Sequence, residues 1–421
     1  MADNSPQPAF PATRREFFHR SASALGLLAF SRFAPAFLVD STLAGAPAPE
    51  RDRRILVVVQ LAGGNDGLNT LVPFEDPDYY RLRPTLGIPK DKVLATGGLF
   101  GFHPACAELH RLFQDGRLAV VHGVGYPNPN RSHFRSTEIW ETASGSGESY
   151  PTGWVGRYLD NSCAGSPGQD RDPVAVHANT LNGEPLSLVG AQSHPTFGLS
   201  PYSGLGGREA EESRRLLESI AGAAGRPGRE ADFLKQTLMD TLVTESRVQA
   251  ILKAYRPHAV YPGNPFAQSL NAVAALIASG MPTRVYFVTL NGFDTHANQL
   301  PKHANLLRVL SEGLATFQGD LESHGLDRQV LTMSFSEFGR RASENESRGT
   351  DHGTASPLFL LGSRVRGGLH GAPPSLKIPK NQDVAFTTDF RSLYTTMLED
   401  WLECPAGGVI AGSFPKLPLV T

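Results

Sequence analysis

Carboxylate and imidazole side chains recur where predicted strands of this 421-residue sequence end or begin. Asp66 follows one run of β-branched residues, and Asp294 with His296 follows another. Asp351 and His352 stand a few residues before a third run. Carboxylate oxygen and neutral imidazole nitrogen are ligands that zinc, manganese and iron accept. The pattern therefore predicts a metal site at one edge of the fold.

The spacing within these groups adds to the prediction. Asp294 and His296 are separated by one residue, so both side chains point the same way in extended backbone. Asp351 and His352 are adjacent, so both can bind one ion only in irregular backbone, which the glycines on either side of Thr350-Asp351-His352 allow. Non-metal roles remain open at this point, because Asp66 suits an Asx-turn and Asp294 suits a helix cap.

A serine precedes one of the predicted helices. Ser132 stands just before residues 134–143, where it could act as an ordinary N-cap. The same position offers chemistry, since a helix N-terminus attracts phosphate or sulfate and a metal-activated hydroxyl there is a candidate nucleophile. Arg131, Arg135 and Arg340 are candidate clamps for the anion.

Other functional classes fit the sequence poorly. The chain has no G-x-S-x-G motif, and Ser132 and His133 are neighbours that rarely face each other, which disfavours a serine hydrolase. The Gly63-Gly64 turn lacks the G-x-G-x-x-G pattern of dinucleotide-binding proteins. The formal net charge of −2, from 39 basic and 41 acidic residues, gives no electrostatic case for nucleic acid.

Runs of β-branched residues alternate with helical patterns along the chain. The expected strands cover residues 54–61, 117–121, 283–290, 329–335 and 357–361. The expected helices cover residues 105–113, 134–143, 209–221, 231–254, 266–278, 303–321 and 390–402. This alternation indicates an α/β fold with a mostly parallel central sheet and helices on both faces. Ligand sites of such sheets form beyond the carboxyl ends of the strands, where the polar residues named above stand.

Residues 1–46 are expected to form a signal peptide and linker. Arg14 and Arg15 precede a modestly apolar stretch, residues 22–30, and small residues follow, which is the order of a twin-arginine export signal. A surface amphipathic helix is the alternative. The apolar stretch is far shorter than the ~20 residues needed to span a bilayer, and no transmembrane helix is expected in the mature chain. We therefore expect the twin-arginine export machinery to deliver the protein to the periplasm or the exterior.

Residues 51–421 are expected to form one α/β domain. A helical insertion is predicted at about residues 205–256, and the Gly-, Ser- and Pro-rich residues 145–203 are expected to be loops around the sheet edge. Three cysteines, Cys106, Cys163 and Cys404, are too few and too far apart for a disulfide scaffold or a thiolate zinc site. The sequence carries no signal for an oligomeric state.

Five motifs, in this order, resemble those of a bacterial family called domain of unknown function 1501. They are Leu61–Thr70, Gly125–Phe134, Gly292–His296, Ser336–Arg340 and Gly349–Gly353. The resemblance extends over about residues 54–415. That family is similar to the alkaline phosphatase and sulfatase superfamily, so the resemblance implies an alkaline phosphatase-like metal-dependent hydrolase.

The resemblance also implies roles for individual residues. Asp66 would be a first metal ligand and Ser132 the nucleophile. Asp294 and His296 would bind one ion, and Asp351 and His352 the other, with zinc, manganese, calcium or magnesium as one or two ions. The Asp294-x-His296 spacing differs from the superfamily's usual Asp-x-x-x-His, and His370 is the one candidate for its late single histidine.

Taken together, the residues and the resemblance predict an exported metal-dependent hydrolase of phosphate or sulfate esters. Its substrate would be a small anionic ester, and Ser132, His133 and Arg340 would be its catalytic residues. The alternative is a non-catalytic member of the same fold that binds a ligand or a cell-envelope partner.

Overall fold

The computed structural model describes residues 53–161, 174–179, 184–190, 196–199 and 247–421. The predicted signal segment, residues 1–46, lies outside these ranges, as does most of the predicted insertion at 205–256. The predicted helix at 209–221 is also outside them. Of the predicted helix at 231–254, the structure describes residues 247–254, which are helical.

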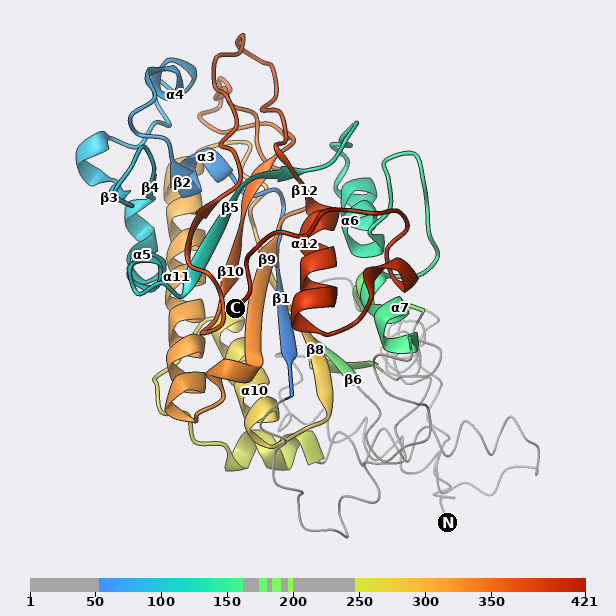
Figure 1. The fold of residues 1–421 in the computed structure, drawn as a ribbon. Helices are drawn as coiled ribbons and strands as arrows, with labels where there is room; N and C mark the ends of the chain where they lie inside the picture. Colours follow the sequence, from blue (N-terminus) through green and yellow to red (C-terminus); the bar gives the residue numbers. More distant parts are fainter. Residues whose placement is uncertain (1–52, 162–173, 180–183, 191–195, 200–246) are drawn as a thin grey trace, which may run out of the picture.

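A nine-stranded sheet forms the centre of the molecule (Figure 1). Its order is β11-β5-β10-β9-β1-β8-β6-β7, with β12 pairing alongside β5. The strands are β1 (Ile55–Ala62), β5 (Leu118–Gly125), β6 (Val174–Ala178), β7 (Thr196–Leu199), β8 (Thr283–Asn291), β9 (Val330–Phe335), β10 (Ser356–Leu361), β11 (Gly368–His370) and β12 (Thr388–Asp389). All neighbouring strands are parallel except β10, which is antiparallel to both β5 and β9. The mostly parallel sheet and its five predicted strands are confirmed.

Strand β1 shows why these runs are continuously apolar. Val57 and Val59 belong to one core cluster, whereas Leu56 and Val58 belong to the cluster on the opposite face. Successive side chains of a strand point to opposite faces, so a strand covered on both sides needs apolar residues at every position.

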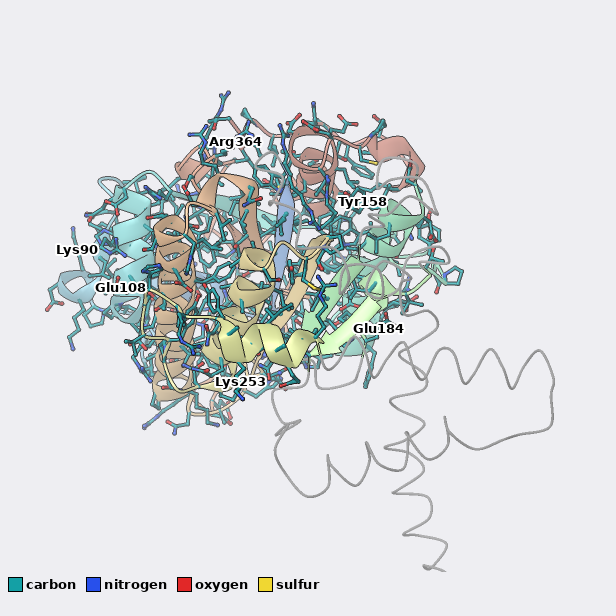
Figure 2. The ribbon with its side chains drawn as sticks, turned by 90° about the horizontal axis from the view of Figure 1, so that it is seen from below. Lys90, Glu108, Tyr158, Glu184, Lys253 and Arg364 are labelled. Carbon is teal, nitrogen blue, oxygen red and sulfur yellow. The ribbon has the colours of Figure 1, made fainter. Side chains whose placement is uncertain are left out.

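Helices cover both faces of the sheet, as predicted. One face is packed against α5 (Ala107–Gln114), α10 (Pro265–Ala278) and α11 (Gln299–Ser323). The other is packed against α6 (His133–Thr142), α7 (Trp154–Asp160) and α12 (Phe390–Thr396), and α12 continues as a π-helical turn, Met397–Trp401. Figure 2 views the molecule from below and places Lys90 and Glu108 at one margin and Glu184 at the other.

Residues 145–203 are not only loops, contrary to the prediction. Helix α7 lies in this stretch, and β6 and β7 extend the sheet beyond β8. The two strands have only five and four residues and lie among Gly, Ser and Pro, so their pattern is too short to stand out.

Several short elements complete the described part of the chain. They are α3 (Gly67–Thr70), α4 (Pro77–Leu82), the small sheet β2 (Leu71–Val72), β4 (Gly101–Phe102) and β3 (Leu94–Ala95), and the 3₁₀ turns Lys90–Lys92, Pro104–Cys106, Leu186–Leu188, Asp327–Gln329 and Ala406–Gly408. Within the described ranges, no helix is both long and apolar enough to cross a membrane.

Strand direction decides which loops meet. Strands β1, β5, β8 and β9 run the same way, so the segments that follow them emerge at one edge of the sheet. Strand β10 runs the opposite way, so the segment that precedes it reaches that same edge. The polar residues named from the sequence stand in these segments, and the topology brings the segments together.

Candidate metal centre

Three donor atoms from two of these segments form a small triangle. Asp294 Oδ1 lies 3.0 Å from His296 Nε2 and 3.1 Å from His352 Nε2, and the two nitrogens are 2.9 Å apart. A third imidazole, His133 Nε2, lies 3.6 Å from Asp294 Oδ2. Donor atoms of a tetrahedral zinc site lie about 3.3 Å apart, because each bond is about 2.0–2.1 Å long. The spacing of these atoms fits a metal ion.

Each of the three histidines has its other ring nitrogen, Nδ1, on an oxygen acceptor. The pairs are His133 with Glu337 Oε1 at 2.9 Å, His296 with Asp351 Oδ1 at 3.2 Å, and His352 with the Arg131 carbonyl at 2.8 Å. A carbonyl or an ionised carboxylate can only accept, so Nδ1 carries the proton of each neutral imidazole. Nε2 then presents a lone pair toward Asp294. Metal-binding histidines in proteins are held in this way.

The charge balance of the cluster also suits a cation. Burial acts to raise the pKa of Asp294, but the Arg340 guanidinium, which donates to it and is positively charged, outweighs burial, so the pKa is lowered to about 2 and this carboxylate is ionised. The hydrogen bond to Glu337 raises the pKa of His133, whereas burial lowers the pKa of His352. The ionised Asp294 carboxylate, which is paired with Arg340, therefore faces three imidazoles.

Arg340 supports this carboxylate from inside the protein. It is 2% exposed and donates to Asp294 Oδ1 at 2.6 Å, and its other donors reach backbone carbonyls, including those of Gly64 and Thr350 at 2.8 Å. The predicted role of Arg340 as an anion clamp does not fit this burial, since its nitrogens are occupied by the loops that they hold. Arg131 pairs with Asp383.

Asp66 does not lie in the cluster, contrary to its predicted role as a first metal ligand. Its side chain is buried in an ion pair with Arg83 Nη1 at 2.6 Å and accepts a hydrogen bond from Gln299. Burial acts to raise the pKa of Asp66, and the nearby Arg83 guanidinium outweighs it and lowers the pKa. The carboxylate thus has a partner that the sequence spacing did not reveal.

Asp351 lies beside the cluster rather than in it. Its Oδ1 accepts from His296 and, at 3.1 Å, from Asn345 Nδ2, so it orients His296. The structure therefore gathers Asp294, His296 and His352 at one position instead of dividing them between two ions. His133 joins this position as well, because ligand atoms of His133, Asp294 and His352 all lie within 4.8 Å of one another.

Ser132 stands at the start of α6, next to the cluster. Its hydroxyl makes no capping hydrogen bond to the helix, and the residue is exposed. Its backbone N–H donates to Asn130 Oδ1 at 2.8 Å. The residue before it supplies the carbonyl that holds His352, and the residue after it is His133. The hydroxyl is thus open to solvent at the rim of the candidate centre.

Glu337 contacts the cluster and has no role assigned to it in the sequence analysis. It is 2% exposed, and its Oε1 accepts from His133 Nδ1 and, at 2.8 Å, from the Gly63 backbone N–H. Its position directly after the predicted strand at 329–335 is the signal that could have identified it.

The Gly63-Gly64 turn serves close packing of these loops. Gly64 has a φ of +84°, and a Cβ there would overlap the Phe338 ring. That ring packs against His352, with centroids 4.5 Å apart, and against His133 at 5.0 Å. A side chain at this position would displace the wall of the cluster, which accounts for the glycine.

Comparison with solved structures finds distant similarity. The lipoteichoic acid synthase LtaP from Listeria monocytogenes has 9% identity, with 89% of this chain and 79% of that chain covered and a TM-score of 0.39. A protein in the alkaline phosphatase superfamily from Vibrio parahaemolyticus has 9% identity, 89% and 74% coverage and a TM-score of 0.36. The C-terminal periplasmic domain of EptC from Escherichia coli, in complex with Zn, has 11% identity, 75% and 74% coverage and a TM-score of 0.33.

Sequence comparison gives a clearer result. No curated protein matches the chain. A family model described as "Protein of unknown function (DUF1501)" matches residues 53–402, which is most of the chain. The match includes all five motifs and every donor atom of the cluster. The protein therefore belongs to the DUF1501 family.

Proposed function

We propose that the protein is an exported metal-dependent hydrolase of phosphate or sulfate esters. One observation carries the proposal: three imidazoles whose Nδ1 atoms are all engaged direct Nε2 toward the ionised carboxylate of Asp294. Four acceptor atoms then face one another, and a cation between them relieves their mutual repulsion. Asp294, His296 and His352 would hold a divalent ion such as zinc or manganese, with His133 as the fourth ligand.

The residues around this position suit an anionic ester. A bound divalent ion would polarise the ester and lower the pKa of the Ser132 hydroxyl. Helix α6 begins at His133, one of the proposed ligands, and the free N–H groups of its first turn would stabilise negative charge on a phosphate or sulfate. Ser132 would attack as the nucleophile from the helix start. Glu337 and Arg340 would keep His133 and Asp294 in position.

The test begins with the purified full chain. We expect one zinc or manganese ion per chain by elemental analysis, and hydrolysis of an aryl phosphate or an aryl sulfate that a chelator abolishes. His352→Ala and Asp294→Asn should each lose the ion and the activity. Ser132→Ala should keep the ion and lose turnover by about 100-fold or more. Ser149→Ala, an exposed serine outside the cluster, is the matched control.

Three results would contradict parts of the proposal. If His352→Ala and Asp294→Asn keep the wild-type metal content, the ion is not held here. If a metal-loaded protein hydrolyses neither ester class, the non-catalytic alternative, a protein that binds a ligand or a cell-envelope partner, replaces the hydrolase. Equal turnover of Ser132→Ala and wild type would remove Ser132 as the nucleophile.

A further inference from the structure

A second hollow opens at the same edge of the sheet as the candidate metal centre. Its volume is about 420 Å³, within the range of small-molecule sites. The wall is mainly apolar and includes Leu68, Leu71, Phe100, Pro357, Leu376 and Val384. Arg340 also lines it, and Arg340 is the residue that donates to Asp294. The pocket and the metal centre therefore share a residue.

His122, on strand β5, is an unpartnered polar side chain in this apolar wall. It is 5% exposed, and its ring makes no hydrogen bond to any residue of the described ranges, although it contacts the Phe100 ring at a centroid distance of 4.7 Å. Burial and the neighbouring His370 lower the pKa of His122 to about 4, so the imidazole is neutral at pH 7. It then offers one donor and one acceptor.

The charges at the pocket do not suit an anion. Glu75 is paired with Lys90 at 2.7 Å, and Asp76 caps α4 by accepting from the Asp78 N–H at 2.9 Å. Lys377 is an exposed cation at the rim, and the guanidinium of Arg340 is occupied by its own loops. Two carboxylates and one free amine do not form a phosphate site, which needs several donors directed at one point.

We propose that this pocket binds an uncharged, mostly apolar ring or chain that carries one oxygen, and that this oxygen is hydrogen-bonded to His122. The apolar wall excludes water from the body of the ligand, and His122 gives the site its preference for an oxygen-bearing group. A further assignment rests on the proposed function: the occupant is the non-reacting part of the ester, held while its charged group lies at the metal centre.

The test compares two probes that differ by one hydroxyl, 2-naphthol and naphthalene, by equilibrium binding to the full chain as purified. Wild type should bind 2-naphthol about fivefold more tightly than naphthalene, which is the effect of one hydrogen bond. His122→Phe keeps a ring against Phe100 but removes both polar nitrogens, so the two probes should bind equally. Leu68→Trp fills the pocket and should weaken binding of both probes at least tenfold.

His110→Phe is the matched control, because His110 is a histidine of α5 whose Nε2 contacts the Ala95 carbonyl and which does not line the pocket. It should leave the probe preference unchanged. The proposal is overturned if His122→Phe retains the wild-type preference for 2-naphthol, or if folded Leu68→Trp, verified by circular dichroism, binds the probes as wild type does.

This binding test separates the pocket from the proposed hydrolase. Probe binding without ester hydrolysis would remove the proposed function and leave the pocket. Ester hydrolysis whose KM is unchanged in Leu68→Trp would remove the assignment of the pocket to the substrate and leave the hydrolase.

Discussion

At the residue scale, the three imidazoles share one bonding pattern but have different supports. His133 and His296 are held by carboxylates, whereas His352 is held by a backbone carbonyl. The hydrogen bond to Glu337 raises the pKa of His133, whereas burial outweighs the hydrogen bond to the Arg131 carbonyl and lowers the pKa of His352. The rings of His133 and His352 would therefore differ in how strongly they bind a cation.

Glu337 tests whether this support matters. Glu337→Ala removes the acceptor of the His133 Nδ1 proton, so the ring can rotate or change tautomer. We expect zinc affinity, measured by competition with a chromophoric chelator, to fall by about 10- to 100-fold. Glu337→Gln keeps an oxygen acceptor and should lose less. Glu138→Gln, which replaces a half-buried carboxylate on α6 that is paired with Arg135, is the control, and an equal loss in that variant would refute the assignment.

Asp66 tests whether the first predicted ligand is structural. Asp66→Asn leaves Arg83 buried without a counter-charge, which should lower the free energy of unfolding by about 3–5 kcal/mol. Metal content should remain that of wild type in the folded variant. Asp78→Asn breaks a more exposed pair with Arg81 and should lower the free energy of unfolding by about 1 kcal/mol or less.

The ion pair of Asp66 also predicts how the free energy of unfolding changes with pH. The pKa of Asp66 is lowered in the folded state, so its contribution is complete above its unfolded value of 3.8 and is lost as pH falls through the folded value. The stability of wild type should therefore fall more steeply below pH 4 than that of Asp66→Asn, as measured by urea unfolding. Parallel profiles would contradict an ionised Asp66.

The sequence predicted part of this site. Asp294, His296 and His352 are side by side because strand ends gather at one edge, which the alternation of strands and helices made foreseeable. The partner of Asp66 was not foreseeable, since Arg83 reaches it only after the turn through α4. The pattern of residue types does not distinguish a carboxylate that binds a cation from one that is neutralised by a guanidinium.

At the element scale, the reversed direction of β10 shapes the site. The chain leaves β9, turns back through residues 336–355 and enters β10, and an antiparallel bridge pairs Arg340 with His352. Backbone hydrogen bonds from Gly353 to Gly339 and from Arg341 to Asp351 extend this pairing. His352 and Arg340, which donates to Asp294, thus lie in the same connecting segment between β9 and β10.

Helix α6, which begins beside Ser132, contains a buried carboxyl group, that of Glu141. The effect of pH on this group reports on how the helix is packed. Burial raises the pKa of Glu141 to about 7, although the Ser187 N–H donates to its Oε2 at 3.1 Å. A raised folded pKa means that stability falls as pH rises from 4.5 to about 7.

Glu141→Gln should therefore stabilise the protein at pH 8, by up to about 3 kcal/mol, and have little effect at pH 4.5. Denaturant unfolding of both proteins at the two pH values measures this difference. Glu138→Gln on the same helix replaces a half-buried carboxylate whose pKa is lowered by its hydrogen bond from Arg135, and it should show no gain at pH 8. An equal change at both pH values in Glu141→Gln would contradict the burial argument.

The elements that the sequence predicted are those that cross the core. Strand β1 is apolar at nearly every position because both of its faces are covered, and such a run is recognisable without any neighbour. Strands β6 and β7 are short and lie at the sheet edge, so their existence depends on β8 rather than on their own composition. The local sequence pattern therefore identifies a strand that is buried on both faces, but not a short strand at the sheet edge.

At the scale of the whole molecule, the proposed export route depends on residues outside the described ranges. Replacing Arg14 and Arg15 by lysine keeps the charge but removes the twin-arginine pair. We expect the full-length variant to remain in the cytoplasm of a bacterial host, whereas wild type reaches the periplasm or the medium, as measured by fractionation and immunoblot. Replacement of Arg20 by lysine is the matched control, and unaltered export of the double variant would exclude this route.

The order of strands in the central sheet has a consequence for synthesis of the protein. Strand β1 comes from the first half of the chain and lies between β8 and β9 from the second half, and β5 lies between β10 and β11 in the same way. The two halves are interleaved, so neither completes its hydrogen bonding alone. The donor atoms are divided likewise, with His133 in the first half and the other three in the second. Under the proposed function, a nascent chain would have all four donor atoms only after His352 has been synthesised, so metal loading would mark chains in which both halves of the sheet have been made.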